Sequence, residues 1–164
     1  MTSRFVVGID LGTTHSALAV VDSEGEDSGP AVQAIAQLVS RGSVEGRALL
    51  PSFVYFAHES EGALALPWDD ERSFCVGELA RERGAEAPGR VISSAKSWLS
   101  HTGIDRRAAV LPLNAAEDIE KISPVEAAWK YLDHLAESWQ HAAAERPALA
   151  EQDVVLAVPA SFDA

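Results

Sequence analysis

Short apolar runs separated by turn residues dominate the first third of the chain, which is the pattern of β-strands. Residues 4–9 and 15–21 form two such runs, and Gly12, Thr13 and Thr14 lie between them. A connection this short reverses the chain, so we expect the two strands to pair antiparallel. The next segments are predicted as a polar loop at 22–30, a strand at 34–39, a loop at 41–47 and a strand at 52–57. Together they predict an antiparallel meander.

Residues 58–73 interrupt this pattern with glycine, proline and a local run of acidic residues, so we expect an excursion on the surface. A short strand at 74–76 is then predicted to lead into a helix at 78–83. A second short helix is predicted at 94–99, with Ser93 or Ser94 as its cap and Gly103 as its stop signal.

The clearest helix signal begins at Ser123. This serine can accept a hydrogen bond from the amide of Glu126, whose carboxylate can reach back, and Pro124 suits the first helical position. The predicted buried stripe consists of Val125, Trp129, Leu132, Leu135 and Trp139. Glu126 and Lys130 have the spacing of an i,i+4 pair on another face, and Pro147 ends the helix.

An apolar run at 154–158 predicts a strand buried on both faces, and therefore central in a partly parallel sheet. With the helices, this indicates the α/β class. Such a strand needs elements packed on each side, but the sequence ends six residues after Val158. We therefore expect residues 1–164 to be a piece truncated at its C-terminus.

Composition limits the possible partners. With 164 residues, 47% of them hydrophobic, the chain suits one compact unit, and its net charge of -12 disfavours nucleic acid as a partner. Cys75 is the only cysteine, which excludes an internal disulfide and a thiolate zinc site and fits a reducing cytoplasm. Asp10 interrupts the first apolar run too early for a signal peptide or a membrane span. We expect a cytoplasmic protein that binds neither nucleic acid nor membrane.

The run GIDLGTTHS, residues 8–16, carries the chemistry. Gly12 lets a ligand approach the backbone, successive amides can point at an anion, and Thr13 and Thr14 add hydroxyl donors. Asp10 can face a divalent cation that bridges phosphates, since magnesium keeps several waters and takes one or two carboxylates. The residues alone also fit a plain tight hairpin with Asp10 as a turn acceptor. His134 and His141 have no third ligand spaced with them, so they indicate a surface pair and not a metal site.

The same run resembles the first phosphate motif of the actin, hexokinase and seventy-kilodalton heat-shock superfamily. Five further segments resemble the heat-shock (DnaK-like) branch in the same order: LPSFV at 50–54, VGELA at 76–80, ISSAK at 92–96, SPVE at 123–126 and VPASF at 158–162. The chain departs from the family pattern at Ser97 and Ser161. It also contains no second phosphate motif of the Asp-x-Gly-Gly-Gly-Thr type, no adenosine-binding motif and no peptide-binding domain.

The resemblance implies the first lobe of a ribonuclease-H-like (actin-like) ATPase, a mixed sheet with flanking helices. It implies that Asp10 holds Mg²⁺ through water, and that Gly12, Thr13, Thr14 and His15 surround the β- and γ-phosphates of ATP or ADP. By the same resemblance Lys96 is catalytic near the γ-phosphate, and Pro159 passes the nucleotide state to a domain that binds clients. A titrating His15 imidazole at that place would make nucleotide affinity depend on pH.

Three interpretations of function remain open. The first is an N-terminal fragment of a DnaK-like chaperone ATPase, inactive alone, whose complete form hydrolyses ATP and binds client polypeptides and co-chaperones. The second is a carbohydrate or small-molecule kinase of the same superfamily, which would not be expected to share the five later segments. The third is a non-catalytic interaction module, which is disfavoured because Asp10, Thr13 and Lys96 are all present.

Overall fold

The computed structural model describes residues 3–25, 29–143 and 145–158 of the chain. Its strands are β1 (Phe5–Leu11), β2 (His15–Asp22), β3 (Ala31–Val32), β4 (Ile35–Ser40), β5 (Ser43–Arg47), β6 (Leu50–Pro51), β7 (Phe53–Phe56), β8 (Phe74–Val76), β9 (Val91–Ser93) and β10 (Asp153–Ala157). Its α-helices are α1 (Glu78–Glu86), α2 (Ala95–Leu99) and α3 (Pro124–Ala142), and its 3-10 turns are η1 (Glu59–Glu61), η2 (Pro88–Arg90) and η3 (Leu149–Glu151). The chain is an α/β protein, as the sequence predicts.

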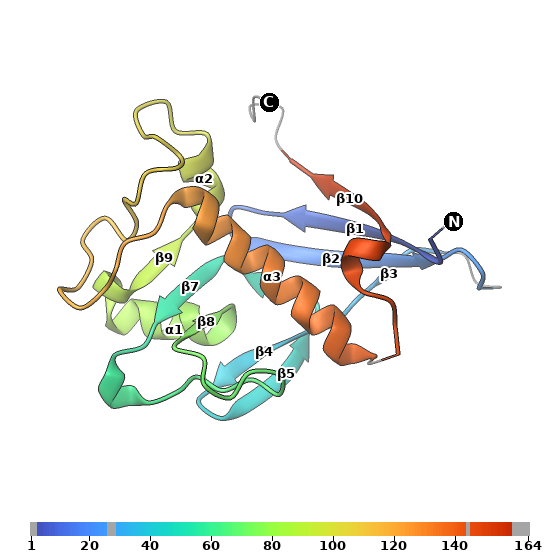
Figure 1. Ribbon diagram of the computed structural model, residues 1–164, viewed down its shortest axis with the longest axis horizontal. Helices are drawn as coiled ribbons and strands as arrows, with labels where there is room; N and C mark the ends of the chain where they lie inside the picture. The colour runs from blue at the N-terminus through green and yellow to red at the C-terminus, as the bar shows by residue number, and fades with distance from the viewer. Residues whose placement is uncertain (1–2, 26–28, 144, 159–164) are drawn as a thin grey trace.

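A mixed sheet forms the part of the molecule that contains the N-terminus (Figure 1). Its strand order in the described residues is β10-β1-β2-β3, with β6 also pairing with β2. β1 and β2 are antiparallel from the pair Phe5–Asp22 to the pair Leu11–Ser16. β10 runs parallel to β1 on its other side. The predicted hairpin and the predicted parallel strand are therefore both confirmed.

Helix α3 covers one face of this sheet. Alternate residues of β1, from Phe5 to Leu11, are buried in one core with α3 residues such as Leu135 and Trp139. Phe5 meets Trp139 edge-on, with ring centroids 5.6 Å apart. The intervening residues of β1, including Asp10, face the opposite side and are more exposed. Asp10 is thus placed on the open face of the sheet by simple alternation.

The remaining strands lie on the other side of α3, where Figure 1 shows the β4–β5 hairpin and the strands β7, β8 and β9. β7 is the middle strand of a three-stranded antiparallel sheet, flanked by β8 and β9. Buried Gln37 of β4 fixes the start of α1, because its Oε1 accepts from the Glu78 amide at 3.0 Å. These strands are antiparallel, as the predicted meander requires. They do not form one continuous meander, however, because they belong to separate sheets.

Two predicted surface segments are wrong. Residues 41–47 contain β5, which pairs antiparallel with β4 across a tight turn in which Gly42 has φ of 75°. β5 carries one large apolar residue, Val44, so no hydrophobic pattern marked it. Residues 58–73 are not a plain excursion either, because Leu64 and Leu66 are buried in a second core with Tyr55.

Helix α3 begins as predicted, with Ser123 and Glu126 forming the reciprocal capping box and Pro124 in the first turn. Its buried stripe is partly wrong, because Trp129 is 65% exposed and the core face centres on Tyr131 and Leu135. Lys130 forms no close salt bridge with Glu126 in the described residues, although its charge adds to the Ser123 hydrogen bonds in lowering the pKa of the Glu126 carboxyl, as expected for the i,i+4 spacing. Its Nζ lies 3.8 Å from the centroid of the Phe74 ring.

His134 is the other correction on α3. It is 1% exposed, and its Nε2 lies 2.9 Å from the carbonyl oxygen of Ala36. Trp68 packs against both His134 and His141, with ring centroids 5.8 and 5.0 Å away. The two histidines are therefore not a surface pair, although both lie on the side of the helix that faces Trp68. The sequence offered no signal for this, because Trp68 belongs to the segment expected on the surface.

β10 is parallel to β1 but it is not buried on both faces. Val154, Val155 and Leu156 are 43%, 62% and 40% exposed. Within the described residues β10 lies at the edge of its sheet and pairs with β1 alone. The apolar composition therefore predicted the strand and its direction correctly, and its burial wrongly. Pro159 lies outside the described residues.

Candidate functional site

The turn from Gly12 to Thr14 requires glycine at its first position. A Cβ at Gly12 would overlap the carbonyl oxygen of His15, a backbone atom that cannot rotate away. Thr13 and Thr14 follow at the tip of the β1–β2 hairpin, and both are exposed. Their hydroxyls make no hydrogen bond to any residue that the structure describes. The tip therefore presents two free hydroxyl groups on a turn too tight for a side chain at Gly12.

Ser52 holds this turn from beneath. Its hydroxyl donates to the Gly12 carbonyl oxygen at 2.8 Å, and its amide donates to the Thr14 carbonyl oxygen at 2.9 Å. The N–H of a trans peptide points opposite to its C=O, so the amides of Thr13 and His15 are turned away from Ser52. Two backbone donors turned away from Ser52, beside two free hydroxyls, are the elements of an anion-binding turn.

Asp10 lies two residues before the turn, on the open face of the sheet. It is exposed, and it forms no ion pair within residues 3–25, 29–143 and 145–158. The same residues contain no group of three or more His, Cys, Asp or Glu side chains that could hold a metal ion. A single free carboxylate is the donor set for a cation that keeps most of its water, as magnesium does, and not for a protein cage. The residues present therefore fit a hydrated magnesium ion.

Lys96 lies on α2, the short helix that follows β9. It is partly exposed, and its ammonium group has no hydrogen-bond or ion-pair partner among the described side chains. α2 begins after Ser94, whose φ of 53° and ψ of 43° are left-handed, and packs against α3. Ser94 occupies the predicted cap position but its side chain makes no capping bond. The lysine is thus an uncommitted cation on a helix whose start is fixed by its backbone.

The structure brings the predicted residues together in two groups. Asp10, Gly12, Thr13, Thr14 and His15 share the end of the β1–β2 hairpin, where partly buried His15 pairs in register with Pro51. Lys96 lies apart from them on helix α2, and Ser52 connects the two groups, because it bonds to the turn and also to the amide of Ser94, two residues before Lys96. The sequence did not single out Ser52, although it lies in the LPSFV segment of the family resemblance. No local pattern identifies a buried serine as such a link.

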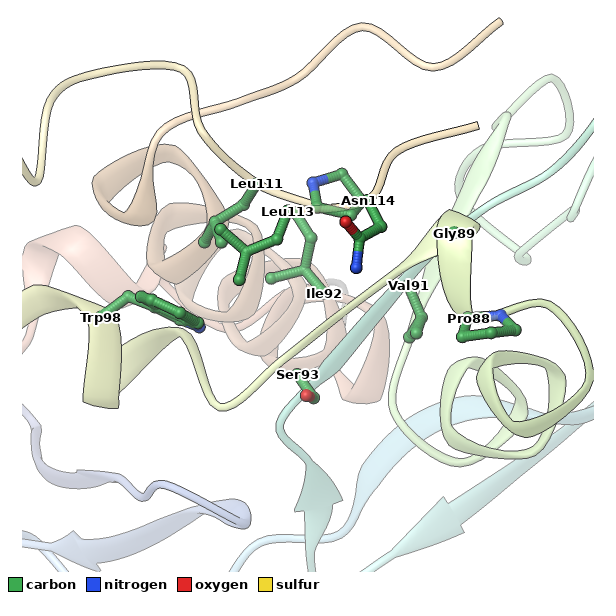
Figure 2. A pocket seen from close by; sticks show the side chains of 10 residues that line it. Pro88, Gly89, Val91, Ile92, Ser93, Trp98, Leu111, Leu113 and Asn114 are labelled. Atoms are coloured by element: carbon green, nitrogen blue, oxygen red, sulfur yellow. The ribbon is translucent and has the colours of Figure 1, made fainter. Parts of the chain in front are cut away.

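A pocket of about 390 Å³ opens on the other side of α2 (Figure 2). The side chains of Trp98, Ile92, Leu111 and Leu113 line it, with Ser93 and Asn114 as its polar groups. None of the predicted phosphate-site residues reaches this pocket. The pocket has both apolar and polar walls. It lies next to the helix that carries Lys96 and is separate from the turn.

Comparison with known proteins gives the relationship. No family model matches the chain. The chaperone HscA of Enterobacter sp. is 31% identical over 175 aligned positions, which cover 98% of this chain and 23% of that protein. HscA of Cronobacter sakazakii is 32% identical over 174 positions with the same coverage. The chain is thus related to the seventy-kilodalton heat-shock chaperones.

The family resemblance seen in the sequence is therefore confirmed over almost the whole chain. A HscA homolog of Methylococcus capsulatus adds 38% identity over 96 positions, 58% of this chain. Almost the whole chain aligns with these HscA proteins, but it spans only about a quarter of their length. The similarity therefore does not show that this chain has the activity of a whole HscA protein. Among the described residues, no helix is both long and apolar enough to cross a membrane.

Proposed function

We propose that residues 1–164 form the first part of the ATPase domain of a DnaK-like chaperone, in the first lobe of a ribonuclease-H-like fold. The observation that carries the proposal is the turn from Gly12 to Thr14, with glycine required by the backbone, two carbonyls held by Ser52 and two hydroxyls free. A turn that only reversed the chain would also use the glycine and the bonds from Ser52, but it would not need the two free hydroxyls of Thr13 and Thr14. The similarity to HscA supports a nucleotide as the occupant.

Each residue then has a defined task. The amides of Thr13 and His15 and the hydroxyls of Thr13 and Thr14 bind the β- and γ-phosphates of ATP or ADP. Asp10 holds Mg²⁺ through its water shell, and the bound ion supplies positive charge that neutralises the phosphates. Lys96 stabilises the negative charge that develops as water attacks, because a fixed cation at that point needs no reorganisation.

The complete protein is proposed to couple ATP hydrolysis to the binding of client polypeptides and co-chaperones in the cytoplasm, with Pro159 passing on the nucleotide state. A carbohydrate kinase of the same superfamily remains the second interpretation of the turn. A non-catalytic module would have no use for two charged groups, Lys96 and Asp10, that are both without a partner among the described residues. These three functions differ in what the full-length gene product does with Mg·ATP.

The test uses the full-length gene product and measures Mg·ATP affinity by calorimetry and phosphate release. Thr13→Val removes one exposed hydroxyl and should weaken affinity about tenfold, the effect of losing one hydrogen bond to a charged group. Thr102→Val, an equally exposed change elsewhere, is the matched control and should leave affinity unchanged. Phosphate transfer to a sugar would support the kinase, and a protein that does not bind Mg·ATP would refute the proposal.

A further inference from the structure

Ser52 is a buried residue with every polar group committed. It is 1% exposed and lies between β6 and β7, where the chain passes from the mixed sheet into the β7–β8–β9 sheet. Its amide and hydroxyl bind the carbonyls of Thr14 and Gly12, as described above. These bonds set the orientation of the peptide groups that face the phosphates.

The carbonyl of Ser52 serves the other half of the site. It accepts from the amide of Ser94 at 3.1 Å and from the hydroxyl of Tyr131 at 3.0 Å. Ser94 is the left-handed residue at the start of α2, two positions before Lys96. Tyr131 is buried on α3, and burial raises the pKa of its hydroxyl, which therefore stays protonated and able to donate. One residue thus holds the turn on one side and the Lys96 helix on the other.

We propose that Ser52 is a positioning residue that fixes the phosphate-binding turn relative to Lys96. This assignment rests on the proposed ATPase function and goes beyond it, because Ser52 itself faces the interior and touches no ligand. The turn belongs to the mixed sheet and Lys96 to helix α2, which follows β9 of the other sheet, so no regular ladder of backbone hydrogen bonds joins them. In-line phosphoryl transfer depends on placing charge within about an ångström of its target, and Ser52 supplies that restraint.

Ser16 provides an internal reference for a purely structural serine. It is as buried as Ser52, and its hydroxyl donates to the Ser52 hydroxyl at 3.4 Å, because the Ser52 hydroxyl already donates to Gly12. Its side chain makes no hydrogen bond to the turn or to α2 in the described residues. Ser16→Ala and Ser52→Ala therefore remove the same atoms from neighbouring places in the core, and only the second removes a bond to Gly12.

The experiment measures Mg·ATP affinity and the single-turnover hydrolysis rate at saturating Mg·ATP in the full-length gene product. Ser52→Ala should lower affinity about tenfold, since the Gly12 carbonyl loses its donor and the turn loosens, and should also slow hydrolysis. Ser16→Ala should lower the melting temperature by a similar amount and change neither quantity more than about twofold. The comparison separates positioning from general loss of stability.

Tyr131→Phe tests the opposite side of the link. It removes only the hydroxyl that binds the Ser52 carbonyl, so the turn keeps both of its donors. We expect hydrolysis to slow several-fold while affinity changes by less than about twofold, because the defect lies on the Lys96 side. This variant decides the matter if Ser52→Ala fails to fold.

The outcomes are distinct. A wild-type protein that binds no Mg·ATP refutes the proposed function, and the assignment of Ser52 with it. A wild type that binds and hydrolyses ATP, with Ser52→Ala indistinguishable from Ser16→Ala or with unchanged hydrolysis in Tyr131→Phe, overturns the assignment of Ser52 alone.

Discussion

At the scale of single residues, the Lys96 ammonium group has no hydrogen-bond or ion-pair partner among the described residues. Arg72, for comparison, is buried against Asp69 and Glu137 at 2.8 and 2.5 Å. Lys96→Ala should therefore cost little stability. If the lysine stabilises developing charge, the variant should lose hydrolysis by at least about 100-fold and keep Mg·ATP affinity within about threefold.

Single-turnover hydrolysis and calorimetry on the full-length gene product check this prediction. Lys121→Ala is the matched control, since Lys121 is exposed and donates only to the Leu113 carbonyl at 3.0 Å. An equal loss of affinity and rate in Lys96→Ala would instead make Lys96 a ground-state contact with the nucleotide.

His134 makes stability depend on pH. Burial lowers its pKa from 6.5 to about 4, the Ala36 carbonyl and Glu137 oppose that shift, and Arg72 adds to it. The unfolded chain therefore takes up the proton first, and the free energy of unfolding falls as pH drops from about 6.5 towards 4. The full loss amounts to about 3 kcal/mol.

Urea unfolding of the 164-residue chain between pH 7 and pH 5 measures the first part of this loss, about 2 kcal/mol. His134→Gln should flatten the dependence, whereas His141→Gln, exposed on the same helix, should keep it. Glu61 acts in a separate range: burial opposes ionisation, but the His58 amide, Tyr55 and Arg83 lower its pKa to about 2. Its contribution is lost only below about pH 4.5. An unchanged slope in His134→Gln would show that another group titrates.

At the scale of elements, the start of α2 is strained in a way that can be measured. Ser94 adopts φ of 53° without a capping bond from its side chain, and a non-glycine residue in this region costs about 1 kcal/mol. Ser94→Gly should raise the free energy of unfolding by about 0.5 kcal/mol. Ser93→Gly, in the extended strand β9, should lower it by a similar amount. If chemical denaturation gave both variants a change of the same sign in the free energy of unfolding, Ser94 would not be strained.

The elements also show what sequence patterns can predict. The β1–β2 hairpin and the start of α3 were predictable, because turn residues and the Ser123 capping box act locally. β5 was not, since Val44 is its single large apolar residue and its conformation depends on pairing with β4. The buried face of α3 differs from the predicted one, because Tyr131 and His134 are in the core and Trp129 is not. Tertiary contacts decided each of these errors.

The same distinction applies to the candidate site. Asp10, Gly12, Thr13 and Thr14 lie within one short stretch of sequence, so a short motif was enough to single them out as candidates. Lys96 was identified by family resemblance alone, since nothing local distinguishes it from a solvated lysine. Ser52 was missed because its role depends on three segments that meet only in the folded chain.

At the scale of the whole molecule, the site is open. Asp10, Thr13 and Thr14 are exposed, and the face of the sheet that carries Asp10 is not covered by described residues. High affinity for a small ligand requires burial of most of its surface, which one wall cannot provide. We therefore predict that the 164-residue chain binds Mg·ATP at least about 100-fold more weakly than the full-length gene product, a difference of about 2.7 kcal/mol.

Calorimetry on both proteins in one buffer checks this difference, with Thr13→Val in each as the control for the site. In the full-length product the variant should lose affinity, because the turn then works against a second wall. In the 164-residue chain the variant should have no measurable effect, because binding there is already weak. Nanomolar affinity of the 164-residue chain, abolished by Thr13→Val, would mean that the described wall is sufficient and that the turn encloses the phosphates by itself. The strength of binding in the short chain therefore measures how much of the site the β1–β2 hairpin supplies.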